Sequence, residues 1–246
     1  RSGANDPGGS ALDENAAFNR FIHAFEGLLG LDAPFSPSRM QQFTDFILQV
    51  KPPPNPIRAL DGSLTASQAN GRNLYFNAPA DGGILTCNFC HVLDPGQGFF
   101  GTDGFSTFEG ETQHFKVAHT RNAYQKVGMF GMGAVPVIAR SGQGSAANRQ
   151  IKGFGFLHDG SIDRVATFLS ANVFNLTASQ EDDLEAFMLA FDTNFAPIVG
   201  QQVTLTSTNG LVADPRVDLL VARADTPWTI TDNNNTPIPN ARECEL

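Results

Sequence analysis

The stretch Cys87-Asn88-Phe89-Cys90-His91 decides how the rest of this 246-residue chain is interpreted. A histidine directly follows the second of two cysteines in CxxCH spacing, which is the signature of covalent haem attachment. Each thiol would add across one vinyl group of the porphyrin, and the short tether would turn the following imidazole toward the iron. The sequence therefore predicts one covalent haem c held by Cys87 and Cys90, with His91 as the proximal iron ligand.

Three other uses of the pentapeptide remain open. A zinc site needs about four ligands, usually from two such pairs, and the sequence has no second CxxC, so that only the distant Cys244 could add a thiol. A thioredoxin-like redox pair is expected in a βαβ context, which the flanking sequence does not supply. A disulfide between Cys87 and Cys90 would leave His91 without a role, so haem attachment is the hypothesis that uses all three side chains.

Composition and charge limit the partners. The chain is 41% hydrophobic, with 21 phenylalanines against 2 tyrosines and 1 tryptophan, so it can bury a core, and phenylalanine also suits the lining of an apolar cofactor pocket. The formal net charge of -9 argues against a nucleic acid or an anionic membrane surface as partner. No apolar run approaches the ~20 residues that span a bilayer, so we expect a chain that does not cross a membrane.

The motif also predicts a location. Covalent haem attachment takes place outside the bacterial cytoplasm, which indicates a periplasmic or extracellular protein. The chain begins at Arg1 and shows no signal peptide, as expected of a mature product or of a fragment. Other domains of a longer parent chain are therefore candidate partners, besides a redox partner protein that the sequence does not name.

We expect a mainly helical chain in three parts. An N-terminal segment, residues 1–56, has apolar residues at helical spacing over 14–29 and 37–50 and ends in a proline-rich linker. The haem domain follows over residues 57–195 and a C-terminal extension over 196–246. Two helices of the haem domain begin with the same pentapeptide, LTASQ, whose threonine and glutamine have capping-box spacing.

The remaining segments are expected to be loops and short strands. Glycines are frequent over residues 92–112 and 133–155, and loops of this length usually wrap a ligand or carry function. In the C-terminal extension, residues 202–208 and 217–224 contain β-branched side chains in partial alternation, which predicts a short antiparallel pair.

Four segments together resemble one haem domain of the bacterial di-haem cytochrome c peroxidase superfamily. Residues 115–122 read FKVAHTRN, which is similar to that family's FKTPTLRN, and residues 156–161 read FLHDGS, which is similar to its YFHDGS. With CxxCH and the helix containing residues 184–187 (LEAF), the resemblance covers about residues 60–195. It implies a cytochrome c-like haem domain in which Arg121 lies beside the haem and binds a propionate through two hydrogen bonds. An exposed or structural ion pair is the other role that Arg121 could have.

The chain also departs from that pattern. The family's peroxidases use two haems, whereas one CxxCH allows only one here, so the two-haem mechanism cannot run within this chain. Residues 123–155 separate the two segments that the family keeps close together, and residues 162–176 hold no methionine that could serve as a ligand. Family analogy allows calcium at a loop, but no EF-hand-like spacing supports it.

The sixth ligand of the iron must then come from elsewhere. Met129 and Met132 lie in a glycine-flanked loop, and a thioether is a common partner of histidine in cytochromes c. We expect Met129, with Met132 as the alternative. His114 or His119 would instead give a bis-histidine site, and His158 is expected to form hydrogen bonds in the HDG turn.

The sequence predicts a mono-haem c-type cytochrome for one-electron transfer with His/Met ligation. Alternatives are a haem peroxidase or oxidase with an open or labile sixth position, or the electron-relay domain of a larger redox enzyme. The sequence offers no general base or nucleophile for a catalytic site, so an electron carrier is favoured over an enzyme. Tyr75 and Met188 are expected to pack within the fold and not to react.

Overall fold

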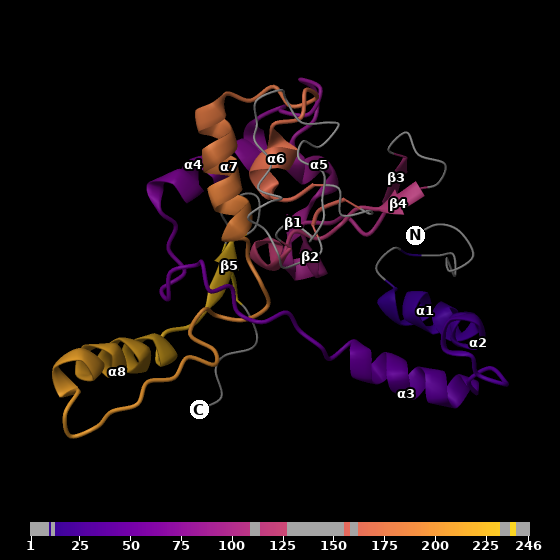
Figure 1. Cartoon of the computed structure of the whole chain (residues 1–246), viewed down its shortest axis with the longest axis horizontal. Coiled ribbons are helices and arrows are strands. Elements are labelled where there is room, and N and C mark those ends of the chain that lie inside the picture. The colour runs from indigo at the N-terminus through magenta and orange to yellow at the C-terminus, as the bar shows by residue number, and fades with distance from the viewer. Residues whose placement is uncertain are drawn as a thin grey trace. The chain divides into compact units, whose positions relative to one another are not determined.

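The computed structural model describes residues 10, 13–108, 114–126, 155–157, 162–231 and 237–239. The described chain is mostly helical, with small two-stranded antiparallel sheets (Figure 1). This confirms the mainly helical prediction. The chain divides into two compact units, one of Arg1–Lys51 with Thr102–Ala118 and one of Pro52–Gly101 with His119–Leu246.

The first unit contains three helical segments before the proline-rich stretch. The single helix expected over residues 14–29 is interrupted, because α1 (Glu14–Asn19) and α2 (Ala24–Leu29) are separated by a 3-10 turn over Arg20–His23. α3 spans Pro37–Ile47, and the Ser36 side chain caps it by accepting a hydrogen bond from the Arg39 amide. Aromatic contacts of the first unit include the Phe18–Phe43 edge contact and the Phe25–Phe35 stack, with ring centroids 5.3 and 4.6 Å apart.

Two hairpins begin within residues 92–112, for which the sequence predicted only a loop. In the first unit, β3 (Ser106–Phe108) pairs with β4 (His114–Lys116). In the second, β1 (Leu93–Asp94) pairs with β2 (Phe99–Phe100) around a turn that ends at Gly98 in the left-handed region. The strands are two or three residues long, so they are too short to show a periodic pattern in the sequence.

Two crossing helices form the frame of the second unit. α4 (Ala66–Asn77) and α7 (Ala178–Leu189) both begin with the predicted capping box, so that expectation is confirmed. They approach closely at Gly71, where an added Cβ atom would lie 1.9 Å from the carbonyl oxygen of Asp183. Only a glycine at this position permits the observed crossing.

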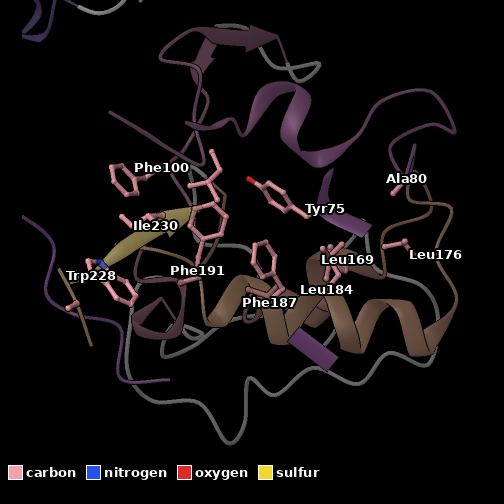
Figure 2. Packing of buried hydrophobic residues seen from close by; sticks show 14 residues of the cluster. Tyr75, Ala80, Phe100, Leu169, Leu176, Leu184, Phe187, Phe191, Trp228 and Ile230 are labelled. Carbon is pink, nitrogen blue, oxygen red and sulfur yellow. The ribbon is translucent and has the colours of Figure 1, made fainter. Parts of the chain in front are cut away.

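The core of the second unit lies beside this crossing (Figure 2). Tyr75 of α4 packs against Phe187 of α7 and against Phe191 just beyond it, with ring centroids 5.4 and 5.5 Å apart. Met188 packs partly buried against the same cluster, which confirms the expected packing role of Met188. A short helix, α6 (Val165–Leu169), joins α7 through the Glu185 carboxylate, which accepts a hydrogen bond of 2.9 Å from the Ala166 amide.

A buried ion pair holds the chain near the C-terminal end of α7. The Arg58 guanidinium lies 2.7 Å from the Asp192 carboxylate and donates a hydrogen bond of 3.0 Å to the Ala190 carbonyl. The Asn55 side chain donates to the carbonyls of Leu189 and Phe191 at 2.8 and 3.0 Å. The stretch that follows the prolines is thus fixed to the core.

The prediction of strands over residues 202–208 and 217–224 is wrong. Residues 202–206 have no regular structure and 207–209 form a turn, whereas 217–224 belong to a long helix, α8 (Gly210–Ala224). Residues 213, 217, 220 and 224 are apolar at helical spacing and are among its more buried positions, so burial of one helical face outweighs the β propensity of the valines. The C-terminal hairpin instead pairs β5 (Thr229–Thr231) with β6 (Pro237–Pro239).

In the described part of the chain, no helix combines the length and apolar character that crossing a membrane requires.

Candidate haem-binding site

The two cysteines of the CxxCH motif lie on a single helical turn. α5 spans Cys87–Cys90, and the His91 amide closes it with a hydrogen bond of 2.9 Å to the Cys87 carbonyl. Residues three positions apart on a helix share a face, so both thiols lie on the same side. They are not joined by a disulfide. Burial raises the pKa of the Cys87 thiol to about 11, which keeps it protonated at neutral pH.

His91 is oriented through one of its ring nitrogens. Its Nδ1 lies 2.9 Å from the carbonyl oxygen of Gly101. When Nδ1 carries the proton and donates to this carbonyl, Nε2 keeps a lone pair for a metal, which is the usual arrangement of ligating histidines. The structure thus provides the support that an axial imidazole requires.

Gly101 is placed by a close contact with the second predicted motif. Its φ angle is +83°, and a Cβ atom there would lie 1.9 Å from Oγ1 of Thr120. The Thr120 amide also donates to the Phe100 carbonyl at 3.2 Å. The CxxCH motif and the end of the FKVAHTRN segment therefore meet at the carbonyl that receives His91, as expected if both serve one site.

Tyr75 contacts the motif from α4. It is 1% exposed, and its hydroxyl donates a hydrogen bond to the backbone carbonyl of His91. Burial, followed by the neighbouring Cys87, raises the pKa of Tyr75 well above its usual value, so the hydroxyl remains a donor at any physiological pH. The expectation that Tyr75 packs is confirmed, but sequence reasoning missed this hydrogen bond because nothing local to α4 indicates it.

Arg121 follows Thr120 and is partly buried. Its guanidinium lies over the ring of Phe100, 4.6 Å from the centroid, and Nη1 donates to the Asn194 side chain. Burial lowers the pKa of Arg121. Among the described residues its buried Nε has no hydrogen-bond acceptor. A propionate is one group that could supply this acceptor, as the resemblance implies.

His119 and His114, the histidines of the bis-histidine alternative, lie in different environments. Desolvation, then the positive charges of Lys126 and Arg121, lower the pKa of His119 to about 4, although the residue as a whole remains exposed. It is therefore neutral at pH 7, as an iron ligand must be. His114 lies on β4 in the first unit. The bis-histidine alternative stays a prediction from the sequence.

Several predicted site residues lie outside the described part of the chain. These are Met129, Met132, His158 and Cys244. Of the HDG segment, the structure describes the flanks, where Phe156 and Ile162 form a β-bridge and Leu157 has a φ angle of +64°. The identity of the sixth ligand therefore remains a prediction.

The residues around the motif fit a haem. Both thiols lie on one face, His91 can offer Nε2, and Arg121 has a buried donor in need of an acceptor. Phe89 and Ile84, within and just before the motif, are 64% and 80% exposed, and a flat apolar group would cover such side chains favourably. Within the described residues, no three His, Cys, Asp or Glu side chains, those of the motif included, are grouped as a metal-ion site.

Comparisons with protein-family models, with curated proteins and with solved structures find no match to this chain. The resemblance to a haem domain of the peroxidase superfamily therefore stays a prediction from the sequence. The geometry of residues 75, 86–101 and 120–121, together with the chemistry of the CxxCH motif, is what indicates a function for this chain.

Proposed function

We propose that this protein is a mono-haem c-type cytochrome that transfers one electron at a time. The observation that carries the proposal is the hydrogen bond from the His91 imidazole to the Gly101 carbonyl, directly after two cysteines on one helical face. This combination leaves one ring nitrogen for iron and two thiols for the porphyrin. Covalent attachment of the haem also implies residence in the periplasm or outside the cell.

The side chains of the site have distinct roles in this proposal. When bound, the haem would supply an iron that alternates between Fe(III) and Fe(II). Cys87 and Cys90 would hold the porphyrin covalently, and His91 would bind the iron through Nε2. The Gly101 carbonyl fixes the tautomer and the plane of the imidazole, since the partner of the second nitrogen orients a ligating histidine.

Two further residues support the site without contacting the iron. Tyr75 holds the His91 backbone through its hydroxyl, and Arg121 provides an N–H donor and a positive charge for a propionate. The aromatic core formed by α4 and α7 keeps water away from this side of the site, which favours a small structural change on electron transfer.

Met129 is proposed as the second axial ligand, with Met132 as the alternative. Thioether ligation raises the reduction potential relative to bis-histidine ligation and leaves no open position for peroxide or oxygen. An open or labile sixth position would favour the peroxidase or oxidase alternative. The electron-relay alternative shares the chemistry of the first proposal and differs in the partner.

The test begins with the chain expressed with bacterial haem-attachment machinery. We expect a mass increase of one haem that survives denaturation, and a spectrum of the oxidised protein with the methionine–iron charge-transfer absorption. Met129→Ala should abolish this absorption, whereas Met188→Leu, a core substitution, should keep it. A mass without covalent haem would refute the proposal.

Carbon monoxide and cyanide separate the electron carrier from the enzyme. A six-coordinate electron carrier should bind neither rapidly in the as-isolated state. Rapid binding of cyanide by the oxidised protein, or of carbon monoxide by the reduced protein, would instead support a peroxidase or oxidase. This measurement needs no knowledge of the redox partner.

A further inference from the structure

We propose that α8 binds the α8 of a second copy of this chain, so that the two helices lie parallel and are related by a two-fold axis. α8 spans Gly210–Ala224 and belongs to the second unit (Figure 1). An exposed apolar stripe and the charges on its two borders indicate this partner. Nothing in the haem proposal uses these residues, so the two proposals stand or fall separately.

α8 has apolar side chains on two opposite faces. One face, with residues 213, 217, 220 and 224, contains some of its more buried positions. The other face, here called the outer stripe, consists of exposed residues at helical spacing, namely Leu211, Val212, Pro215, Leu219 and Ala222. Leu211 and Val212 are 98% and 81% exposed. Because a helix that is apolar on all sides is normally buried, the outer stripe is a surface for a partner.

Within one chain, α8 receives little support from packing. Of its 15 residues only Ala213 is buried. Pro215 lies inside the helix, where a proline removes a backbone hydrogen bond and is unfavourable. Isolated helices of this length are marginal in water even when their sequences favour a helix. Burial of the outer stripe against a partner would supply the packing that stabilises α8.

The two borders of the outer stripe carry opposite charges. Asp218 and Asp225, one heptad apart, lie on one border, and Arg216 and Arg223, also one heptad apart, lie on the other. In the heptad notation of paired helices, the acids occupy position g and the arginines position e. The a and d positions between them are Val212, Pro215, Leu219 and Ala222. The helix thus has the pattern of one strand of a short coiled coil.

The charges also determine how the two helices are oriented. Side chains at e and g set partner choice and orientation in paired helices. In a parallel pair, the g border of each helix faces the e border of the other, so Asp218 lies opposite the partner's Arg223 and the contact occurs twice. In an antiparallel pair, each border faces its own copy, which would place acids against acids and arginines against arginines. The charges of α8 therefore favour the parallel pair.

A second copy of the chain fits this surface because the surface is complementary to itself. A two-fold axis brings the same patch of both copies together and closes the assembly at two chains. An anionic membrane surface fits less well, because the chain has a formal net charge of -9. α8 is about 22 Å long, so the interface is small and the dimer should be weak, with a dissociation constant in the micromolar range.

Sedimentation velocity of the whole chain, with its haem if attached, tests the pairing. The sedimentation coefficient should rise from that of a monomer to that of a dimer between micromolar and sub-millimolar protein concentrations. Leu219→Glu places an acid in the middle of the outer stripe and should weaken the dimer at least about tenfold. The matched control is Val221→Glu, because Val221 is 57% exposed on the same helix and lies off the stripe. This variant should dimerise like the unaltered chain.

Exchange of the charges tests the orientation of the helices. Asp218→Arg and Arg223→Asp should each dimerise several-fold more weakly than the unaltered chain, because each places like charges opposite one another. An equimolar mixture of the two variants should recover the dimer, because the mixed pair has opposite charges at both contacts. In an antiparallel pair, Asp218→Arg would instead strengthen the dimer by removing the repulsion between acidic borders.

Three outcomes would overturn the proposal. They are a monomer at every concentration, equal effects of Leu219→Glu and Val221→Glu, and a stronger dimer in Asp218→Arg. If Arg223→Asp does not fold, the exposed Asp218 decides the orientation alone, since its substitution has opposite effects in the two arrangements. A chain without covalent haem would refute the cytochrome and leave this test intact, because absorbance of the aromatic residues also follows sedimentation.

Discussion

The helices α4 and α7 begin identically and then serve different purposes. Each starts within the pentapeptide LTASQ, at its alanine, spans 12 residues and has both hydrogen bonds of a capping box. The body of α4 presents a glycine and a tyrosine to the core, whereas that of α7 presents Leu184 and Phe187. A shared start signal therefore establishes only where a helix begins, and the later residues determine what it does.

The difference has a structural consequence at each helix. α4 approaches the α7 backbone at Gly71 and reaches the backbone of His91 through the Tyr75 hydroxyl. α7 supplies aromatic packing and the Glu185 carboxylate that caps α6, and the chain beyond it is held by the Arg58–Asp192 ion pair. Four sets of substitutions can break or sharpen this comparison.

The largest effect is expected at the ion pair beyond α7. Arg58→Met leaves the buried Asp192 carboxylate without its partner and should lower the free energy of unfolding by about 3–5 kcal/mol, measured by chemical denaturation. Arg39→Met on the exposed surface of α3 is the control and should change it by less than about 0.5 kcal/mol. A loss at Arg58 as small as that of the control would show that the pair contributes little.

The loss of unfolding free energy in Arg58→Met should depend on pH. Burial raises the pKa of Asp192 from 3.8, and Arg58 opposes this, so removing Arg58 raises the pKa further. A raised folded pKa gives stability that is present below the unfolded pKa and is lost as pH rises through the folded pKa. The free energy of unfolding of the variant should therefore be closest to that of the unaltered protein near pH 4 and become progressively lower toward pH 7. A difference that does not change with pH would contradict this.

The next largest effect concerns the crossing of the two helices. Gly71→Ala places a Cβ atom 1.9 Å from a backbone oxygen of α7, and overpacking of this kind costs about 3 kcal/mol. Gly27→Ala in α2 is the matched control, since no atom lies within 4 Å of its added Cβ and a helical alanine gains up to about 1 kcal/mol. The midpoint of thermal unfolding should fall in Gly71→Ala and rise in Gly27→Ala. Equal shifts in the two variants would show that helix propensity alone is being measured.

A smaller effect is expected where α4 reaches the motif. Tyr75→Phe keeps the ring but leaves the His91 carbonyl without its donor, which should cost about 1–3 kcal/mol. If Tyr75 positions the axial ligand, the reduction potential of the haem-loaded protein should shift as well. Tyr124→Phe replaces the only other tyrosine and should leave the potential unchanged. An altered stability with an unaltered potential would limit Tyr75 to a structural role.

The smallest effect is expected at the two caps. Thr65→Ala and Thr177→Ala each remove the side chain that accepts the first-turn hydrogen bond, at a cost of about 1 kcal/mol. Because the two boxes are identical, the two losses should agree within about 0.5 kcal/mol, and threonine-to-serine controls should restore most of each. A clear inequality would mean that tertiary contacts reinforce one cap.

Features that depend on residues close together in the sequence were predicted correctly, whereas features that depend on tertiary contacts were not. The capping boxes and the mainly helical character depend on residues a few positions apart, and both are confirmed. The strands expected over residues 202–208 and 217–224 were wrong, because the β propensity of Val217 and Val221 is weaker than the gain from burying one face of α8. The hairpin that includes β3 was missed because its strands are too short to show a pattern.

The same rule holds at the candidate site. Spacing within five residues predicted two thiols and an imidazole for one haem. The Gly101 carbonyl and the Tyr75 hydroxyl, which hydrogen-bond the ring and the backbone of His91, could be found only in the folded chain. Met129 and Met132 lie outside the described residues, so the proposed second axial ligand is still a prediction from sequence.

By itself the sequence determined the chemistry that this protein offers, namely two thiols and an imidazole in CxxCH spacing, and the local starts of its main helices. Only the tertiary structure decided which distant groups support that chemistry, and it brought Arg58 to Asp192 and Trp228 onto Gly62. The physical reason is that caps and motifs are satisfied within a turn of chain, whereas buried charges and donors find partners only when the core has closed around them.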